Sequence, residues 1–583
     1  HRHPAWPHHL LIAAFTTTND KGEIMHPFRP VPAPSAPPRR AAIAGAVLAV
    51  LAGATASTLQ AAPLETDNPD LSIRFDNSVK YSQSYRLREA SPGLASCAIC
   101  LNQNDGDNNF GKGLVSNRVD LLSEIDVTYQ DVGLRVSGAA WYDAQYRSSN
   151  DNNTITANHV PGNAFPAVTR KLLGKKAELL DAFVFGKARL NDMQASFRLG
   201  RHTLLWGESL FYGSNGIAGG QAPTDLVKLL SVPNAQFKET AMPTGKLSGQ
   251  VQVNEALSLG AYYQYDWRKT RMMPVGGYLS TSDAMGEGGE RIIAGNPALP
   301  NPPAFAALPE QEPKHGGQYG AQLRLRATDI DTDFGFYATR YHATTPSNIY
   351  STLTGFPPAP RPSTFQWTYA EGVRAYGVSV AKAIGEVSLS GEVSVRRNTP
   401  LSSSGQSILG SIGVNVGLNN TSMPGYAIGE TAHAQLSWLA SLGPSVVSQE
   451  ASFVGEIAWN RITSVTRNAA MLNPNADRSA TALRMVYSPT YRQLFPGIDL
   501  SIPVGISHTH GRSGALGPGF GVHRGGDLNL GVSAIYLNGW TLAANYTRYY
   551  GPEGPTLDGA NNAQFKQALR DRDYVSVSIR NTF

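Results

Sequence analysis

Alternation of apolar and polar residues along most of the chain is the feature that most constrains the fold. The clearest stretch runs from Arg118 to Tyr146, RVDLLSEIDVTYQDVGLRVSGAAWYDAQY, in which two alternating runs flank a short QDVG. Successive side chains of a β-strand point to opposite faces, so each run predicts a strand with one apolar and one charged face. Nothing within this hairpin covers the apolar face.

The same alternation recurs toward the C-terminus, in KLSGQVQVNEALSLGAYYQYDWR, EVSLSGEVSVRR, GIDLSIPVGIS and LNLGVSAIYLNGWTLAANYTRYY. Short turns such as QDVG, LNDM and AIGE join hairpin partners, and long segments rich in Pro and Gly separate the hairpins. The long segments are about residues 89–112, 148–176, 203–241, 272–315, 344–369, 399–425, 462–478, 510–526 and 550–571. Short turns on one side and long loops on the other are typical of outer-membrane barrels.

We therefore predict an all-β fold, a single transmembrane antiparallel barrel of about 18 strands with short periplasmic turns and long extracellular loops. Its apolar faces would meet lipid and its charged faces a water-filled lumen. The soluble alternative, a large β-sandwich or propeller, needs the apolar faces to cover each other, and the sequence shows no repeated blade motif. Aromatic residues near predicted strand ends are expected to form interfacial girdles: Tyr129, Tyr146, Trp267, Trp459, Trp540 and Tyr546.

Residues 1–61 are predicted to be a leader and signal peptide that is removed, with Met25 as the true start. Arg39 and Arg40 precede the apolar run AAIAGAVLAVLAGATAS, and small residues lead to a cleavage site near Ala61 or Ala62. The run is shorter than the ~20 residues of a membrane-spanning helix. The barrel would then comprise residues 62–583 in the outer membrane. Much of the net charge of +5 precedes residue 41, so it gives no support for a nucleic-acid partner.

The C-terminal strand also fits this location. The chain ends in Phe583, preceded at alternating positions by Ile579, Val577 and Val575. The pattern resembles the terminal signal that barrel-assembly machinery recognises, although Asn581 departs from the usual apolar residue. We expect this machinery and outer-membrane lipid as partners.

Several separated segments resemble the family filed as domain of unknown function thirteen-oh-two. They are NDGDNNFGKGLVSNRVDLLSEIDVTY, GLRVSGAAWYDAQY, GRHTLLWGESLF, LSLGAYYQYDWRKTRMMPVGGYLSTSD, GQYGAQLRLRA and DRDYVSVSIRNTF. The likeness covers roughly residues 70–583 and implies a Gram-negative outer-membrane protein. It also implies an association with a lipoprotein-like partner, an RND-type exporter and the degradation of hydrophobic compounds. One departure is that Gly276 and Gly277 stand where the family suggests a cysteine.

The loop before the second predicted strand holds three candidate features. Cys97 and Cys100 are the only cysteines, and in an oxidising compartment they are expected to form a small disulfide loop. Asp105, Asp107 and Asn109 are spaced like the start of a calcium loop, but Phe110 replaces its glycine and the twelfth position has no Glu. A polar loop is the favoured interpretation, calcium is the alternative, and no other cofactor is expected. GDNNFGKG lacks the hydroxyl residue and the following helix of a phosphate-binding loop.

The third long segment, 203–241, is the strongest candidate for a constriction. APTDLVKLLSV predicts a short helix with Thr224 as N-cap, Asp225 in the first turn and Pro233 after its end. If the segment folds into the lumen, the side chains expected to line the constriction are Trp206, Glu208, Asp225, Lys228, Lys238 and Glu239. A surface lid that stays outside the pore is the alternative.

The charged face of the predicted strands supplies the candidate pore lining. These residues are Arg118, Asp120, Glu124, Asp126, Arg135, Asp143, Asp266, Arg268, Arg324, Arg326, Glu392 and Arg396. Both signs are present, so pairs across neighbouring strands and weak ion selectivity are expected. His433 and Ser437 share the lumen face of one strand, but no protease or hydrolase motif occurs, and an enzyme is not predicted.

The sequence thus predicts a porin-like channel for small, hydrophobic or aromatic solutes. The alternative is a non-conducting outer-membrane component of an RND-linked envelope system that moves hydrophobic cargo or lipid. The substrate, the direction of transport and the oligomeric state do not follow from the sequence.

Overall fold

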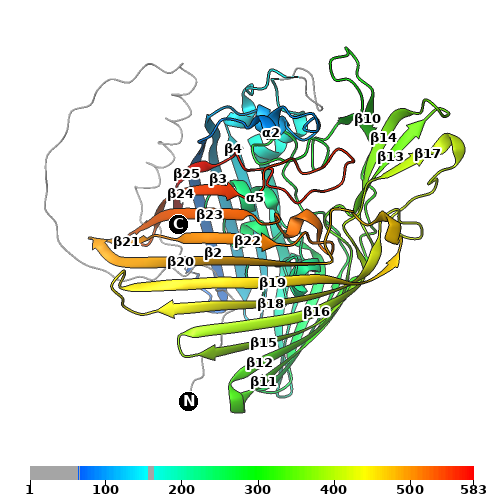
Figure 1. Cartoon of the computed structure of the whole chain (residues 1–583). Helices are drawn as coiled ribbons and strands as arrows, with labels where there is room; N and C mark the ends of the chain where they lie inside the picture. The colour runs from blue at the N-terminus through cyan, green and yellow to red at the C-terminus, as the bar shows by residue number, and fades with distance from the viewer. Residues whose placement is uncertain (1–62, 65, 155–162) are drawn as a thin grey trace, which may run out of the picture.

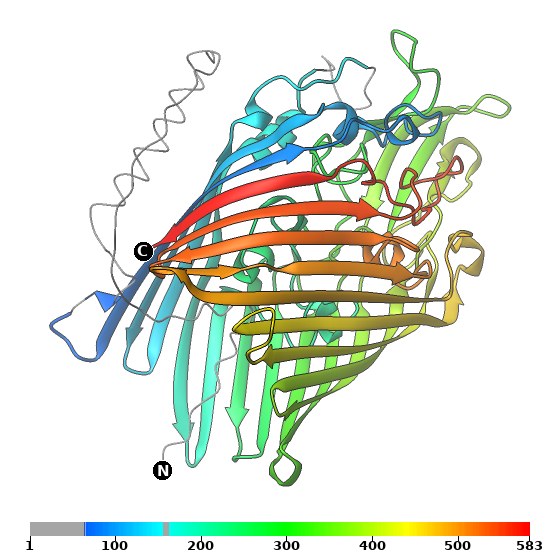
Figure 2. The same ribbon diagram turned by 60° about the vertical axis from the view of Figure 1, so that its left-hand side comes forward.

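A closed antiparallel barrel of eighteen strands dominates the computed structural model, which describes residues 63–64, 66–154 and 163–583 (Figures 1 and 2). Its strands are β2 (Leu71–Arg86), β3 (Gly113–Tyr129), β4 (Val132–Asp143), β5 (Lys175–Leu190), β6 (Met193–His202), β7 (Thr244–Gln252), β8 (Leu257–Gln264), β11 (Gln318–Ala327), β12 (Thr332–Tyr341), β15 (Val373–Ile384), β16 (Val387–Pro400), β18 (Ile428–Leu442), β19 (Glu450–Arg467), β20 (Ser479–Phe495), β21 (Ile498–Ser501) continued by β22 (Val504–His510), β23 (Gly526–Tyr536), β24 (Trp540–Tyr550) and β25 (Tyr574–Thr582). The predicted leader and signal peptide lie outside the described residues.

The barrel closes between its first and last long strands. β2 pairs with β3 on one side and with β25 on the other, in a register that runs from Ser78↔Thr582 to Arg86↔Tyr574. The short strand β1 (Pro63–Leu64) pairs with the start of β2. The fold class and the strand number predicted from the alternation are therefore confirmed.

The two faces of each strand have the exposure that the alternation predicts. On β3, Leu121 and Ile125 are 40% and 42% exposed on the outer face. Arg118 and Glu124, of the opposite parity, are only 3% and 5% exposed because they face the occupied lumen. An apolar outer surface of this kind is what a membrane-spanning barrel requires.

The connections also follow the predicted division. Short turns such as 130–131, 191–192 and 385–386 lie at one end, and the long loops lie at the other. Beyond the rim, loop strands form a second sheet, labelled in part in Figure 1, of β9 (Arg291–Ile293), β10 (Ala304–Ala307), β13 (Asn348–Thr354), β14 (Arg361–Thr368) and β17 (Gln406–Leu409).

Helices in the described residues are short. They are α2 (Pro92–Ala95), α3 (Asp105–Asn108), η2 (Gln145–Arg147), α4 (Ala167–Thr169), η3 (Arg170–Gly174), η4 (Ile217–Gly220), α5 (Leu226–Ser231), α6 (Phe237–Thr240), η5 (Thr328–Ile330), η6 (Gly410–Ile412), η7 (Ala469–Met471) and η8 (Gly517–Phe520). Among them, none has the length and hydropathy that a membrane span would need.

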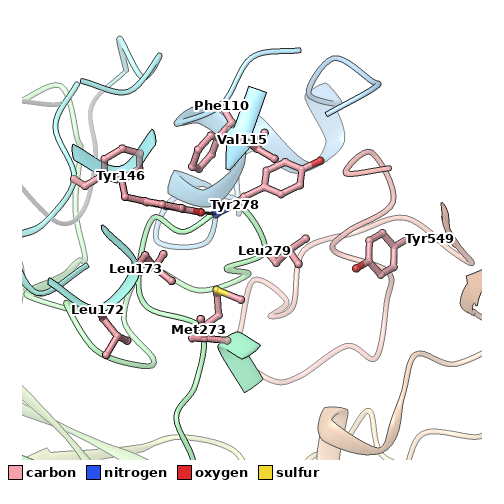
Figure 3. Packing of buried hydrophobic residues seen from close by; sticks show 11 residues of the cluster. Phe110, Val115, Tyr146, Leu172, Leu173, Met273, Tyr278, Leu279 and Tyr549 are labelled. Carbon is pink, nitrogen blue, oxygen red and sulfur yellow. Dashed lines mark hydrogen bonds between the residues drawn. The ribbon is translucent and has the colours of Figure 1, made fainter. Parts of the chain in front are cut away.

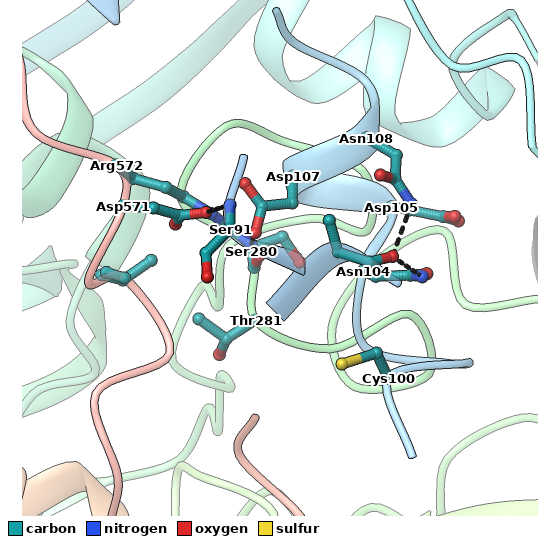
Figure 4. A network of polar contacts seen from close by, with 12 residues as sticks. Ser91, Cys100, Asn104, Asp105, Asp107, Asn108, Ser280, Thr281, Asp571 and Arg572 are labelled. Carbon is teal, nitrogen blue, oxygen red and sulfur yellow. Dashed lines mark hydrogen bonds and ion pairs between the residues drawn. The ribbon is translucent and has the colours of Figure 1, made fainter. Parts of the chain in front are cut away.

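Buried aromatic and aliphatic side chains join several long loops above the lumen. We call this group the aromatic cap (Figure 3); it consists of Phe110, Val115, Tyr146, Phe165, Leu172, Leu173, Val227, Met273, Tyr278, Leu279 and Tyr549. Beside it, a buried ion-pair network joins the same loops. Asp107 lies 2.6 Å from Arg86. It also lies 3.4 Å from Arg572, and Figure 4 labels both residues of this second pair. The loops around the cap are therefore packed against one another.

One local sequence interpretation is wrong, and a second needs refinement. Tyr146 and Trp267 were expected in interfacial girdles, but they are 5% and 4% exposed and pack among the loops. Tyr146 lies in η2, beyond the end of β4, and Trp267 stacks edge-on against Tyr369 at 5.2 Å. GIDLSIPVGIS contributes one barrel strand, as expected, but that strand is interrupted between β21 and β22 at Pro503, which has no N–H to donate to the ladder.

Candidate pore constriction

Residues 203–243, which join β6 to β7, fold into the barrel and contact its inner wall on both sides. We call this segment the lumen loop. Its first half touches β16, β18 and β19, and its second half touches β3, β4, β5 and β25. A loop of this kind narrows a lumen that eighteen strands would otherwise leave wide.

One carboxylate on β19 holds the beginning of the loop by its backbone. Glu456, which is fully buried, accepts hydrogen bonds from the backbone N–H groups of Leu210 (2.9 Å), Phe211 and Tyr212 (3.1 Å). It also accepts one from the Ser209 hydroxyl at 2.9 Å. A single wall residue thus fixes four consecutive loop residues.

A second carboxylate, on β16, acts in the same way. Glu392 accepts from the backbone N–H groups of Glu208 (2.8 Å) and Ile217 (2.7 Å) and from the Gln435 amide (3.0 Å). The loop comes so close that a Cβ on Gly207 or Gly216 would overlap the Glu392 carboxylate. Glycine at these two positions therefore permits the approach.

Arg396 and the side chain of Asn215 complete the attachment of the first half of the lumen loop. Arg396 donates to the carbonyls of Ser214, Asn215 and Gly216 at 2.8–2.9 Å. The Asn215 side chain in turn bonds His433 at 3.0 Å.

His433 and Ser437, the catalytic alternative from the sequence, both take part in holding the loop. The second ring nitrogen of His433 bonds Thr431 at 2.8 Å, and the Ser437 hydroxyl donates to the Glu208 carbonyl at 3.1 Å. These contacts use both side chains for positioning the loop.

The second half of the loop contains α5, one residue later than predicted. Asp225, not Thr224, is the N-cap, because its carboxylate accepts the Lys228 backbone N–H at 3.1 Å. Thr224 instead forms an isolated bridge with Ala241. The helix ends at Ser231, two residues before Pro233, in agreement with the end predicted from the sequence.

Side-chain ion pairs hold this second half. Arg271 pairs with Asp225 and with Glu178 of β5, and Lys228 lies 3.5 Å from Glu178. The Lys228 ammonium also lies 5.0 Å from the ring centre of Trp141 on β4, which is cation–π geometry. Further along, Lys238 pairs with Glu124 of β3.

The remaining constriction candidates have distinct surroundings. Trp206 packs between Tyr262 and Tyr337, at ring distances of 5.0 and 6.3 Å. Glu208 lies 3.8 Å from Arg324, and burial raises the pKa of its carboxyl while Arg324 opposes that shift. Glu239 accepts the Gln236 backbone N–H at 2.8 Å. All six candidates lie in the lumen loop.

Predicted wall charges pair extensively. Arg118 binds Asp120 through two nitrogens, at 2.7–3.0 Å, and Arg135 contacts both Glu124 and Asp126. Asp143, by contrast, accepts from Ser116, Asn117 and Gln145 at 2.6–3.0 Å.

Three of the predicted lining residues lie near strand ends, and one of them, Arg268, bonds the last residue of the lumen loop. Asp266 and Arg268 follow the end of β8, where they contact His315 at 3.1 Å and the Pro243 carbonyl at 3.0 Å. Arg326 is near the short turn after β11 and pairs with Asp331 and Asp333.

Two cavities lie between the second half of the lumen loop and the wall made by β2, β3 and β25. The upper cavity is nearer the long loops and is lined in part by Ser84, Arg118, Asp143, Ser231, Tyr278 and Tyr574. The lower cavity is lined by Lys80, Asp120, Gln236, Glu239, Arg580, Ser78 and Leu122. The same three strands line both cavities, so the two are stacked along one side of the lumen.

Sequence reasoning missed Glu178, Trp141, Lys80 and Arg580 as site residues. Lys80 and Arg580 had a usable signal, since they share a parity with polar neighbours on their strands. Glu178 had none, because its role depends on cations that the lumen loop and the next long loop bring to it.

In the first long loop, the two cysteines and the candidate calcium ligands have different partners. A disulfide joins Cys97 and Cys100. Asp107 takes part in the arginine network, whereas the Asn109 amide donates to the Gly276 carbonyl at 2.9 Å. In the described residues, no group of three or more His, Cys, Asp or Glu side chains is arranged to hold a metal ion.

The chain is similar to several solved structures, at low sequence identity. OccAB4 of Acinetobacter baumannii is 9% identical, with 88% of this chain and 98% of that chain covered and a TM-score of 0.40. OpdK of Pseudomonas aeruginosa, solved with vanillate, is 12% identical over 87% of this chain and 98% of its own, with a TM-score of 0.38. The outer membrane channel DcaP of A. baumannii is 9% identical over 90% and 100%, with a TM-score of 0.35.

Curated proteins give no match to the chain. A family model does match, over residues 42–583, and its description is a protein of unknown function, DUF1302. The match covers most of the chain and includes every strand of the barrel. The chain therefore belongs to the DUF1302 family.

Proposed function

We propose that this protein is an outer-membrane channel through which small solutes diffuse, with the lumen loop as its constriction. The observation that supports this most is the course of the loop, which crosses the barrel and is fastened to opposite walls. Glu392 and Glu456 hold one half, and Glu124 and Glu178 hold the other. Such a loop sets the cross-section of a barrel that is otherwise wide.

The charges of the constriction favour small solutes without a strong charge. Cations and anions of the wall pair with each other or with the loop, as Arg118 does with Asp120 and Arg135 with Glu124. Paired charges leave little net field along the path, so strong selectivity for anions or cations is not expected. We infer that the accepted solutes are small and apolar or aromatic.

Planar-bilayer recording tests the channel. We expect small single-channel steps from the wild type and larger steps after deletion of residues 210–235, because the deletion removes most of the crossing segment. The deletion leaves β6 and β7 intact, so the barrel itself should still form. Absence of steps from both proteins, each shown to be folded and inserted, would rule out the channel.

That outcome would favour the alternative, a non-conducting component of an envelope complex with a periplasmic or RND-type partner that moves hydrophobic cargo or lipid. Capture of such a partner from envelope extracts would then identify the system. We infer a transport role and no catalysis, and substrate turnover that is lost on His433→Ala would contradict this.

A further inference from the structure

We propose that three arginines on the outer face of the barrel bind the phosphate groups of a lipid headgroup. They are Arg340 on β12, Arg374 on β15 and Arg397 on β16, three strands that lie side by side (Figure 1). We call them the arginine row. The inference rests on the membrane location that the proposed function includes, and it does not depend on whether the barrel conducts.

The pairing register places the three side chains of the row directly beside one another. Arg340 is opposite Arg374 in the ladder of β12 and β15, and Arg374 is opposite Arg397 in the ladder of β15 and β16. Cβ atoms of directly opposed residues are about 4.5–5.5 Å apart, and like charges placed opposite each other are destabilising. A bound anion would relieve this repulsion.

The row faces the surroundings of the barrel and not its lumen. Its neighbours of the opposite parity, such as Val373 and Arg396, are buried on the inner face. The next outward residues, Tyr376 on β15 and Val395 on β16, are exposed and belong to the apolar outer band. The arginines follow this band at the end of the barrel that carries the long loops. In a membrane, that level is occupied by lipid headgroups.

Acidic side chains of the protein neutralise the row only in part. Glu430 lies 3.4 Å from Arg397, but the Arg397 side chain remains 63% exposed. Glu371, three positions before Arg374, contacts Lys314 at 3.9 Å. Arg374 itself is exposed and has, among the residues that the structure describes, no ion pair and no side-chain hydrogen bond. Arg374 is therefore open to a ligand.

A phosphate group attached to acyl chains fits this surface. Guanidinium groups bind phosphate through paired N–H···O hydrogen bonds, which makes arginine well suited to phosphate recognition. Exposed apolar side chains on the same strands, such as Val378 and Val393, would contact the acyl chains of the same lipid. A free anion would use the arginines but not the apolar surface beside them, so the occupant is a lipid.

Lipid A, a glycolipid with two phosphate groups on its sugar headgroup, is the probe. The full chain in a non-ionic detergent is titrated with it, and bound lipid is counted by native mass spectrometry. Arg374→Gln combined with Arg397→Gln should weaken binding about tenfold or more, because each change removes a charged hydrogen-bond donor to phosphate. Lipid A without its phosphates should bind the wild type as weakly. Equal binding of the two lipids, or of the wild type and the double variant, would overturn the proposal.

Arg548→Gln is the matched control. Arg548 is exposed on the outer face of β24, and its partner on β23 is Leu528 and not a second arginine. The control variant should therefore retain wild-type binding. Weakening equal to that of the double variant would show that any outward arginine suffices, and it would contradict a site at the row.

Thermal stability distinguishes a lost site from a misfolded variant. In detergent alone, the double variant should unfold at a temperature at least as high as the wild type, because the repulsion between opposed arginines is gone. Added lipid A should raise the unfolding temperature of the wild type more than that of the double variant, since a ligand stabilises the state that binds it. An equal rise in both proteins would count against the row.

Conductance separates this inference from the proposed function. The row faces away from the lumen, so the double variant should conduct like the wild type. Single-channel steps without phosphate-dependent lipid binding would overturn the lipid site and leave the channel standing. Lipid binding that depends on Arg374 and Arg397, without steps even after deletion of residues 210–235, would overturn the channel and retain the site.

Discussion

The two halves of the lumen loop are fastened to the barrel by different chemistry. Residues 208–217 are held by their backbone, whose N–H groups donate to Glu392 and Glu456. Residues 225–240 are held by side chains, in ion pairs of Asp225, Lys228 and Lys238. Both cavities border this second half, through Ser231, Gln236 and Glu239.

Backbone attachment depends mainly on the wall residues, and among the loop's own side chains Ser209 and Asn215 add to it. Each wall carboxylate can therefore fix a segment such as GESLFYGSNGI while its exposed side chains vary. Side-chain attachment places charges and hydroxyls toward the remaining space, where they would contact any solute that the proposed channel admits. We infer that the first half closes one side of the lumen and that the second half sets the selectivity of the other side.

Release of the first half of the lumen loop, which is held by its backbone, should have the largest effect on conductance. Glu392→Ala combined with Glu456→Ala leaves several buried amides without acceptors, at about 1–3 kcal/mol for each group. We expect the single-channel conductance at least to double, as measured in planar bilayers. Glu430→Ala is the control, since this β18 carboxylate is partly exposed and pairs with Arg397 at 3.4 Å. Unchanged conductance in the double variant would show that the first half stays in place without its carboxylates.

Loss of Glu178, the wall carboxylate that binds the second half of the lumen loop, should change the ion selectivity more than the single-channel conductance. Glu178→Gln leaves Arg271, Lys228 and Lys176 without their shared carboxylate, and removing one partner of a buried pair costs about 3–5 kcal/mol. We expect the reversal potential in a salt gradient to shift toward anion selectivity. Asp331→Asn, at an exposed pair with Arg326 near a short turn, should leave the potential unchanged. A shift toward cations would contradict this assignment of the second half.

A methyl group at the point of closest approach tests the tight fit of the first half. Gly216→Ala places a Cβ against Glu392, and overpacking of this kind costs about 1–3 kcal/mol. We expect noisier open-channel current and a lower unfolding temperature, followed by heat-dependent gel migration. Gly213→Ala is the matched control, because a Cβ there has no neighbour within 4 Å among the described residues. The same current noise and the same unfolding temperature in the two variants would mean that the loop moves freely at Gly216.

The barrel was predictable because lipid and water impose a period of two on every strand. Leu121 and Arg118 differ in parity, and that parity alone assigns them to opposite faces. The interruption at Pro503 and the burial of Tyr146 were not recognised, because one depends on a missing donor and the other on where β4 ends. The parity of a residue depends only on its position along the strand, so it can be read from the sequence without knowledge of the tertiary structure.

The constriction was predictable only in outline. The length and composition of 203–241 indicated an inward loop, but not which wall residues would hold it. Glu456 accepts from Leu210 and Tyr212 across 244–246 positions of sequence, and no local pattern encodes such a contact. The N-cap moved from Thr224 to Asp225 because Thr224 is used in a bridge to Ala241.

The smallest expected effect concerns the long loops, at a histidine whose two ring nitrogens bond residues outside the lumen loop. His342 begins the loop after β12; its Nδ1 accepts the Gly372 backbone N–H at 3.0 Å, and its Nε2 donates to the Gly316 carbonyl at 3.1 Å. Burial lowers the pKa of His342, the Gly316 bond and Glu371 oppose that shift, and Arg340 and Lys314 add to it. The neutral ring is therefore the form that joins the two loops.

Because the folded-state pKa is depressed, the stabilisation is present above the unfolded value of about 6.5 and is lost as pH falls through the lower folded value. Hydrogen exchange at the Gly372 amide, corrected for the intrinsic rate, should show less protection at pH 4.5 than at pH 7.5. His342→Gln has no group that titrates in this range, so its protection should not change between the two conditions. The conductance should also stay constant, since these loops do not hold Glu392 or Glu456. The same loss of protection in wild type and His342→Gln would assign the acid sensitivity to another group, with Glu371, which faces the same ring, the first to replace.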